Sequence, residues 1–309
     1  MALGAPPMID VMGGSGGGAA PLPPRTEVSA ARAPRGRKLP AISLGIIGLF
    51  VLMAILAPLL SLADPHNQSL RNRFKPPAWE ERGSWHYPLG TDRLGRDMLS
   101  RIVWGARVSL AAGVITVLLA SAFGAAVGLV AGYYGGRVDA SLMRVTDATL
   151  SFPVILLALI LAVTVGPSFT NVVVAIAVIL WARYARVIRG QVLTVMQLDF
   201  IAQARIAGAG AWRIITRHLF PNTLNTLVVL VTLQIGYVII VEASLSFLGA
   251  GIPPPTPAWG SMIAEGREFV TSAWWVSMFP GLAILLVVLS FNLIGDWLRD
   301  TLDPKLRQL

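Results

Sequence analysis

The chain has few of the side chains with which enzymes do chemistry. It contains no cysteine, which excludes disulfides, thiolate metal sites and cysteine nucleophiles. None of its three histidines belongs to an HExxH zinc motif. Its three lysines follow Arg37, Phe74 and Pro304 rather than a glycine, so the chain lacks the P-loop lysine that would reach nucleotide phosphates. We therefore expect no catalytic, metal or cofactor site here, but a protein that moves or holds something.

The composition indicates a membrane protein. Of 309 residues, 55% are hydrophobic and 13% are charged, and the mean hydropathy is +0.67, whereas about a quarter of an average soluble domain is charged. A net charge of +9 would suit a nucleic-acid-binding protein. Long charge-free runs interrupt the basic residues, however, as in membrane proteins whose Lys/Arg loops set the orientation. We predict an all-α polytopic membrane protein that contacts the lipid bilayer and no nucleic acid.

The charge-free runs predict the membrane-spanning helices, because a bilayer core about 30 Å thick needs roughly 20 apolar residues in a helix. The longest run, 148–182, contains Gly166-Pro167-Ser168, a turn-forming sequence that divides it into two antiparallel helices. Arg183, Arg186 and Arg189 then lie at the end of the fourth span, where long side chains can reach the headgroups. The six predicted spans are about 40–62, 108–132, 148–165, 170–188, 222–247 and 277–297.

The ends and the basic residues predict the topology. Residues 1–38 are rich in Gly, Pro and Ala and are typical of a flexible tail, which leaves 39–309 as the transmembrane domain. With both termini on one side, that side holds 16 Lys and Arg and the other holds nine. Because cytoplasmic loops carry the basic excess, we expect both termini to be cytoplasmic.

Small and acidic residues within the spans suggest particular contacts. Gly124, Gly128 and Gly132 recur every fourth residue, and small residues at this spacing let another helix approach closely. Glycine is also common in membrane helices generally, but we favour a packing face.

Glu242 lies near the end of the fifth span, where it is either a functional carboxylate or one that is solvated or paired on its own helix.

The loop 191–221 is predicted to be structured. Residues 198–207 and 211–219 are typical of two short helices around a Gly-Ala-Gly bend, and Pro221 is expected to stop the second. Trp212 supplies apolar surface and three arginines supply positive charge. Such a protrusion suits docking into a groove on a partner; the alternative is a basic loop that only enforces topology.

This loop resembles the coupling loop of ABC-importer permeases, whose pattern is E-A-A-x3-G-x9-I-x-L-P. Gly208 and Pro221 have the expected separation, while Ala202-Gln203-Ala204 occupies the E-A-A triplet and lacks its Glu. The segments 86–110, 242–263 and 291–304 resemble the C-type permease of dipeptide/oligopeptide importers. Together these similarities cover essentially everything after residue 40.

The resemblance implies the type I ABC importer permease fold with six transmembrane helices, in the bacterial cytoplasmic (inner) membrane. It also implies partners: a homologous B-type permease, two ABC ATPase subunits that use ATP and Mg, and an extracytoplasmic peptide-binding protein. The residues that it assigns to ATPase coupling are Ala202, Gln203, Ala204, Arg205, Gly208, Arg213, Arg217 and Pro221. No substrate-binding residue is identified.

The same resemblance implies import of dipeptides or short peptides, although nickel and glutathione permeases share the family. The alternatives from other classes are an ion-coupled secondary transporter acting alone and a structural membrane subunit. The first would show more buried ionisable residues and an internal repeat.

The segment 86–107 is the last candidate site. Thr91 or Asp92 is predicted to cap a helix that carries an apolar stripe. The arginines that flank this stripe are Arg93, Arg96 and Arg101. The helix is expected either to lie at the membrane surface and receive the binding protein, or simply to pack on the spans.

Overall fold

The computed structural model describes residues 39–60 and 63–302, and within these ranges its regular secondary structure is helical apart from an isolated bridge between Thr91 and Asp97. The predicted tail 1–38 lies outside the described residues. The helices are α1 (Ala41–Leu56), α2 (Met98–Tyr134), α3 (Gly136–Leu150), α4 (Val154–Val165), α5 (Phe169–Val195), α6 (Asp199–Ile206), α7 (Ala211–Ile214), α8 (Phe220–Phe247), α9 (Trp259–Gly266) and α10 (Trp275–Leu302). Short helical turns are η1 (Leu70–Asn72), η2 (Ile215–Leu219) and η3 (Arg267–Phe269). The all-α prediction is confirmed.

Fewer helices than six are long and apolar enough to cross a membrane. Among the described residues, α2, α5, α10 and the continuous helix Ala211–Phe247 qualify, and α3 with α4 makes a fifth if this pair, bent by 86°, is one span. Helix α1 has 16 residues, shorter than the predicted span 40–62. The predicted third span, 148–165, is wrong in its first part, because Pro153 lacks an N–H and disfavours helical geometry in the residue before it.

The predicted break between the third and fourth spans is confirmed. Helix α4 ends at Val165 with Gly166 as its C-cap, and Ser168 is the N-cap of α5, where it accepts a hydrogen bond from the Asn171 N–H at 3.1 Å. This side-chain cap satisfies a backbone donor that the first turn of a helix leaves open.

Helices α2 and α5 pack closely along the predicted glycine face. A Cβ added at Gly124 would lie 2.3 Å from the Trp181 carbonyl oxygen, and one at Gly128 would lie 2.6 Å from the Ala185 carbonyl oxygen. At Gly132 a Cβ would lie 2.6 Å from a Val192 side-chain carbon. The packing face is therefore confirmed, and any side chain there would force the helices apart.

Helix α2 begins earlier than the second predicted span. Asp97 is its N-cap and accepts from the Ser100 N–H at 2.9 Å, so the predicted caps Thr91 and Asp92 are wrong. The expected surface helix is the first part of α2, with Met98 and Ile102 buried. Of the alternatives for segment 86–107, packing on the spans is the one observed.

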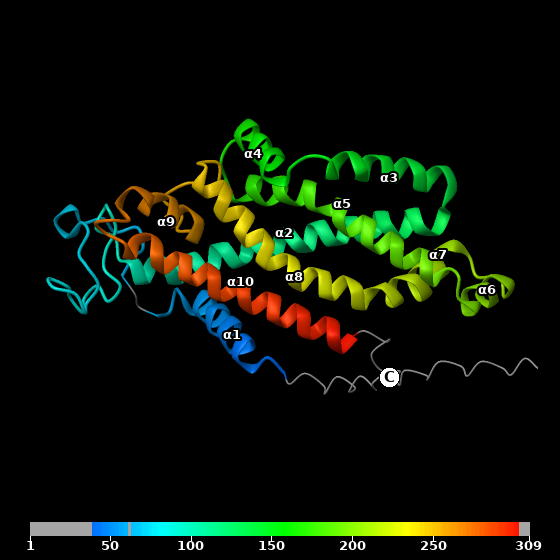
Figure 1. The fold of residues 1–309 in the computed structure, drawn as a ribbon, viewed down its shortest axis with the longest axis horizontal. Helices are drawn as coiled ribbons and strands as arrows, with labels where there is room; N and C mark the ends of the chain where they lie inside the picture. The colour runs from blue at the N-terminus through cyan, green and yellow to red at the C-terminus, as the bar shows by residue number, and fades with distance from the viewer. Residues whose placement is uncertain (1–38, 61–62, 303–309) are drawn as a thin grey trace, which may run out of the picture. The chain divides into compact units, whose positions relative to one another are not determined.

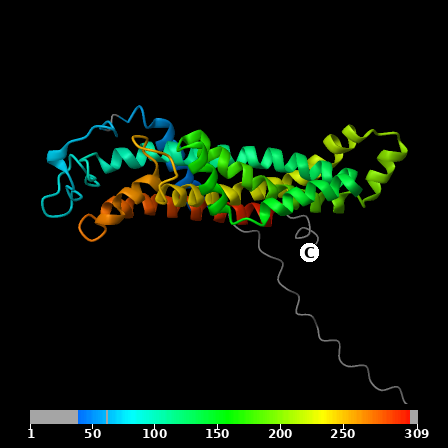
Figure 2. The ribbon, with the colours of Figure 1, turned by 90° about the horizontal axis from the view of Figure 1, so that it is seen from above.

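The bundle presents different elements at its opposite ends. Helices α6 and α7 lie at one end, and segment 63–97 with α9 lies at the other (Figure 1). The view from above has the same arrangement (Figure 2). We call residues 198–219 the coupling protrusion and residues 63–97 with α9 the cap end.

Candidate functional site: the coupling protrusion and the cap end

A glycine shapes the bend of the coupling protrusion. Gly208 follows α6 with φ of +78°, a region that residues with a side chain rarely adopt. The Gly208 N–H donates to the Arg205 carbonyl at 3.0 Å and the Ala209 N–H donates to the Ala204 carbonyl at 3.0 Å. This is the Schellman arrangement that closes helix ends. Apart from the two adjacent residues, no described residue has an atom within 4 Å of a Cβ built at Gly208, so backbone conformation rather than space requires glycine.

The protrusion is anchored to the bundle by buried aliphatic side chains. Ile201, Ile214 and Leu219 are fully buried. They share a core cluster with Leu129 of α2 and Val192 of α5. Since protein interiors are close-packed, displacement of the protrusion is transmitted to α2 and α5.

The outer surface of the protrusion combines apolar and basic groups. Ile206 is 88% exposed and Trp212 is 77% exposed. Its exposed arginines are Arg205, Arg213 and Arg217, and within the described part of the chain none of them forms an ion pair. Ala202 and Gln203 are exposed as well, and Ala204 is half-buried. The structure thus brings the predicted coupling residues into one protrusion, except for Pro221, which lies in the first turn of α8.

Pro221 does not stop the helix that precedes it, so that prediction is wrong. Helix α7 continues through η2, a π-helical turn, directly into α8, whose first turn contains Pro221. The Phe220 N–H donates to the Ile215 carbonyl five residues earlier. A widened turn of this kind accommodates a residue that has no N–H to donate. Helix α7, η2 and α8 therefore form one continuous helix, Ala211–Phe247, which the Gly208 bend separates from α6.

The arginines of α5 do not lie at its end as predicted, because α5 extends to Val195. Arg189 makes paired hydrogen bonds of 2.5 Å to the carboxylate of Asp139 on α3. Arg186 forms an ion pair with Asp147, also on α3. Arg183 instead lies near the middle of α5, where its guanidinium donates to Gln234 of α8.

The cap end holds a buried ionic network that the sequence did not reveal. Asp92 bonds Arg96 at 2.6 Å and Arg101 at 2.5 Å. The carboxylate of Glu265, on α9, bonds the same arginines at 2.5 and 2.8 Å. The exposed fraction of these four side chains ranges from 0% to 9%. Arg96 and Arg101 are therefore structural groups rather than a docking surface.

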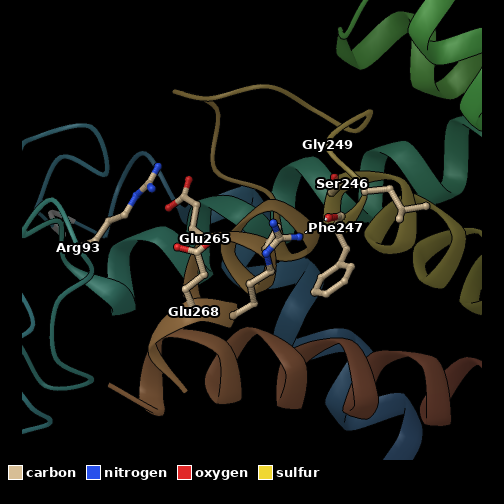
Figure 3. Close-up of a pocket in the computed structure, with 9 residues that line it drawn as sticks. Arg93, Ser246, Phe247, Gly249, Glu265 and Glu268 are labelled. Atoms are coloured by element: carbon tan, nitrogen blue, oxygen red, sulfur yellow. Dashed lines mark hydrogen bonds between the residues drawn. The ribbon is translucent and has the colours of Figure 1, made fainter. Parts of the chain in front are cut away.

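Of the three arginines predicted to flank the apolar stripe, Arg93 is the exposed one. It lines a pocket of about 410 Å³ together with Glu265, Arg267 and Glu268. In Figure 3, Arg93 and Phe247 lie on opposite sides of the two glutamates. Charges of both signs meet there, so the pocket has no strong preference for an anion or a cation.

Glu242 is buried, and its position supports pairing on its own helix rather than solvation. The Ser246 hydroxyl donates to one carboxylate oxygen at 2.8 Å, and the other oxygen has no partner in the described structure. Among residues 39–60 and 63–302, no group of three or more His, Asp or Glu could hold a metal ion.

Comparison with known proteins identifies the family. Residues 124–308 match the family described as "Binding-protein-dependent transport system inner membrane component". Residues 30–77 match the N-terminal transmembrane domain of oligopeptide transport permease C.

Relatives match over most of their length. The chain is 44% identical over 266 residues to a putative peptide transport system permease protein of Brucella suis, covering 86% of this chain and 88% of that protein. A dipeptide transport system permease protein of Haemophilus influenzae is 44% identical over 267 residues, with 86% and 90% covered. A glutathione transport system permease protein of Pectobacterium atrosepticum is 46% identical over 264 residues, with 84% and 86% covered. The chain belongs to the family of binding-protein-dependent transport system inner membrane components, the multi-pass ABC permeases with the type I importer fold.

Proposed function

We propose that this chain is the permease subunit of an ATP-driven importer of dipeptides or short peptides. It pairs with a homologous B-type permease, receives peptide from an extracytoplasmic binding protein, and is driven by separate ATPase subunits that use ATP and Mg. The coupling protrusion faces the cytoplasm together with both termini. ATP binding closes the ATPase pair, which pushes the protrusion and rocks the attached helices between inward-open and outward-open states.

The observation that carries this proposal is the coupling protrusion. Its exposed indole and exposed arginines offer a surface with no acidic partner in the described residues, and docking to a groove would cover both. Its buried face is locked to α2 and α5. A push from outside would therefore move helices of the bundle.

The test is charge reversal on this surface. The variant Arg213→Glu with Arg217→Glu is expected to abolish ATP-dependent peptide uptake while membrane insertion is unchanged, because like charges then face the partner. The matched control is Arg137→Glu with Arg144→Glu, which makes the same charge change at exposed positions of α3 and should leave uptake near the wild-type level. Wild-type uptake by the Arg213/Arg217 variant, at equal protein amounts, would contradict the docking role.

Glutathione is the second candidate cargo, since a glutathione permease is among the relatives. Competition settles the choice: excess unlabelled dipeptide should block uptake of labelled dipeptide more strongly than excess glutathione does. The reverse order of competition would favour glutathione.

A further inference from the structure

Arg183 occupies an unusual position for a charged residue. It lies 14 residues after the start of α5 at Phe169 and 12 before its end at Val195. At 1.5 Å per residue this places it about 20 Å along a helix that is long and apolar enough to cross a membrane. A charge within the hydrocarbon layer is unfavourable unless it faces protein or water.

The neighbouring arginines show how the same helix neutralises charge elsewhere. Arg186 pairs with Asp147, and Arg189 pairs with Asp139. Arg183 has no such carboxylate: it contacts the Gln234 amide oxygen at 3.3 Å and lies 5.7 Å from the ring centre of Tyr237. These partners are neutral and Arg183 is exposed, so its positive charge is uncompensated within the described chain.

The contacts to α8 position the Arg183 guanidinium and leave most of its N–H donors available. Gln234 also lies at the middle of its helix and is 6% exposed, and its amide nitrogen has no partner in the described structure. A guanidinium has five N–H donors, of which one is engaged by Gln234. The remaining donors can form the bidentate pair with a carboxylate for which arginine geometry is suited.

We propose that Arg183 lines the water-filled path and binds the terminal carboxylate of the peptide in transit, with Gln234 and Tyr237 as positioning residues. This inference rests on the proposed function. Every linear peptide with a free C-terminus carries this carboxylate, so the contact serves cargo of any side-chain composition. A lone arginine flanked by neutral groups also holds the anion weakly enough to release it, as transport requires.

The first test separates transport rate from affinity. Arg183→Gln should lower the maximal uptake rate about tenfold or more, as loss of hydrogen bonds to a charged group implies. The KM should stay unchanged, because the binding protein captures the peptide. Arg183→Lys should retain part of the rate. Arg186→Gln is the matched control, since its exposed ion pair is worth little, and its uptake should stay near wild type.

The second test restores the charge chemically. The chain has no cysteine, so Arg183→Cys gives a single thiol for water-soluble thiosulfonates. A cationic reagent should restore uptake, and an anionic reagent should not. Val174→Cys is the control for access: Val174 is exposed but nine residues away, on the opposite side of the helix, and in lipid it should not react.

Several results would overturn the inference. Normal uptake by Arg183→Gln would rule out the proposed contact between Arg183 and the peptide carboxylate. Equal rescue by both reagents would show that bulk, not charge, matters at this position. Loss of the second permease from the complex purified with Arg183→Gln would assign Arg183 to an acid of that partner. Failure of the wild type to accumulate peptide with ATP would instead contradict the proposed function. The experiment thus distinguishes failure of the proposed function from failure of the role assigned to Arg183.

Discussion

The arginines of the cap end and those of the coupling protrusion differ in burial and in pairing. At the cap end, Arg96 and Arg101 are buried and paired with the nearby Asp92 and with Glu265 from a distant part of the chain. On the protrusion, Arg213 and Arg217 are exposed and without ion pairs in the described residues. Each charge of the buried network has a partner of opposite sign within the chain, whereas the basic surface of the protrusion has none among the described residues. The difference fits the proposed function, in which a partner subunit covers the protrusion, whereas the arginines of the cap end stabilise the chain itself.

The cap end is also tied to the last helix. The Trp275 indole donates to the Thr91 carbonyl at 3.0 Å, and the Trp274 indole donates to Glu80 at 3.0 Å. The Trp259 indole donates to the Ile102 carbonyl at 3.0 Å. Segment 63–97, α2, α9 and α10 are therefore joined at this end.

The largest expected effect is at the cap end. Arg101→Leu should lower the free energy of unfolding by about 3–5 kcal/mol, because it removes one of the two arginines that pair with the buried carboxylates of Asp92 and Glu265. Arg93→Leu, an exposed position in the same segment, should change it by less than about 0.5 kcal/mol. Thermal or denaturant unfolding of the purified complex measures both. Equal stability of the two variants would mean that the network does not stabilise the cap end.

A smaller loss is expected along the helices that connect the two ends. Gly128→Ala should destabilise by about 1–3 kcal/mol, because the added methyl group would overlap α5. Gly48→Ala on α1, where no atom lies within 4 Å of the new Cβ, should be neutral or stabilising. The same unfolding experiment compares them, and a neutral Gly128→Ala would contradict the close packing of α2 and α5.

Strain at the protrusion should affect coupling more than stability. Gly208→Val should cost about 1–2 kcal/mol locally, since a side chain is disfavoured at positive φ, and should abolish uptake. Gly210→Val is the control, because Gly210 has φ of −69° and open space around it. Uptake at equal expression measures the pair; equal activity would argue against a role for the bend.

The smallest stability change is expected at the exposed indole. Trp212→Ala should leave the free energy of unfolding within about 0.5 kcal/mol of wild type, because Trp212 is 77% exposed. Its uptake should nevertheless fall, since the apolar contact with the partner is lost. Normal uptake by Trp212→Ala would show that the indole is not needed for docking and that the basic residues are sufficient.

Local sequence rules predicted much of this fold. The turn at Gly166-Pro167-Ser168, the bend at Gly208 and the glycine face of α2 are each determined by residues close together in sequence. Proline was harder to interpret: Pro153 breaks a helix that hydropathy alone made continuous, and Pro221 lies in a helix that it was expected to stop. Whether a proline breaks a helix or lies within one depends on the backbone hydrogen bonds around it, and amino-acid composition does not reveal these.

Tertiary partners could not be predicted from one sequence. Arg101 and Glu265 are 164 positions apart, so nothing local indicates their pairing. Arg183 was placed at a helix end because it is charged; the extension of α5 to Val195 puts it at mid-helix instead. The candidate coupling residues were found because a motif gathers them in one loop, whereas the cap network has no such signature.

The central claim is that this chain is a gate driven by ATP hydrolysis on another subunit. The most direct measurement is peptide accumulation in liposomes that contain both permeases and the binding protein, with and without the ATPase subunits. The account predicts accumulation against a gradient only when ATPases and ATP are present. Accumulation without any ATPase would contradict it.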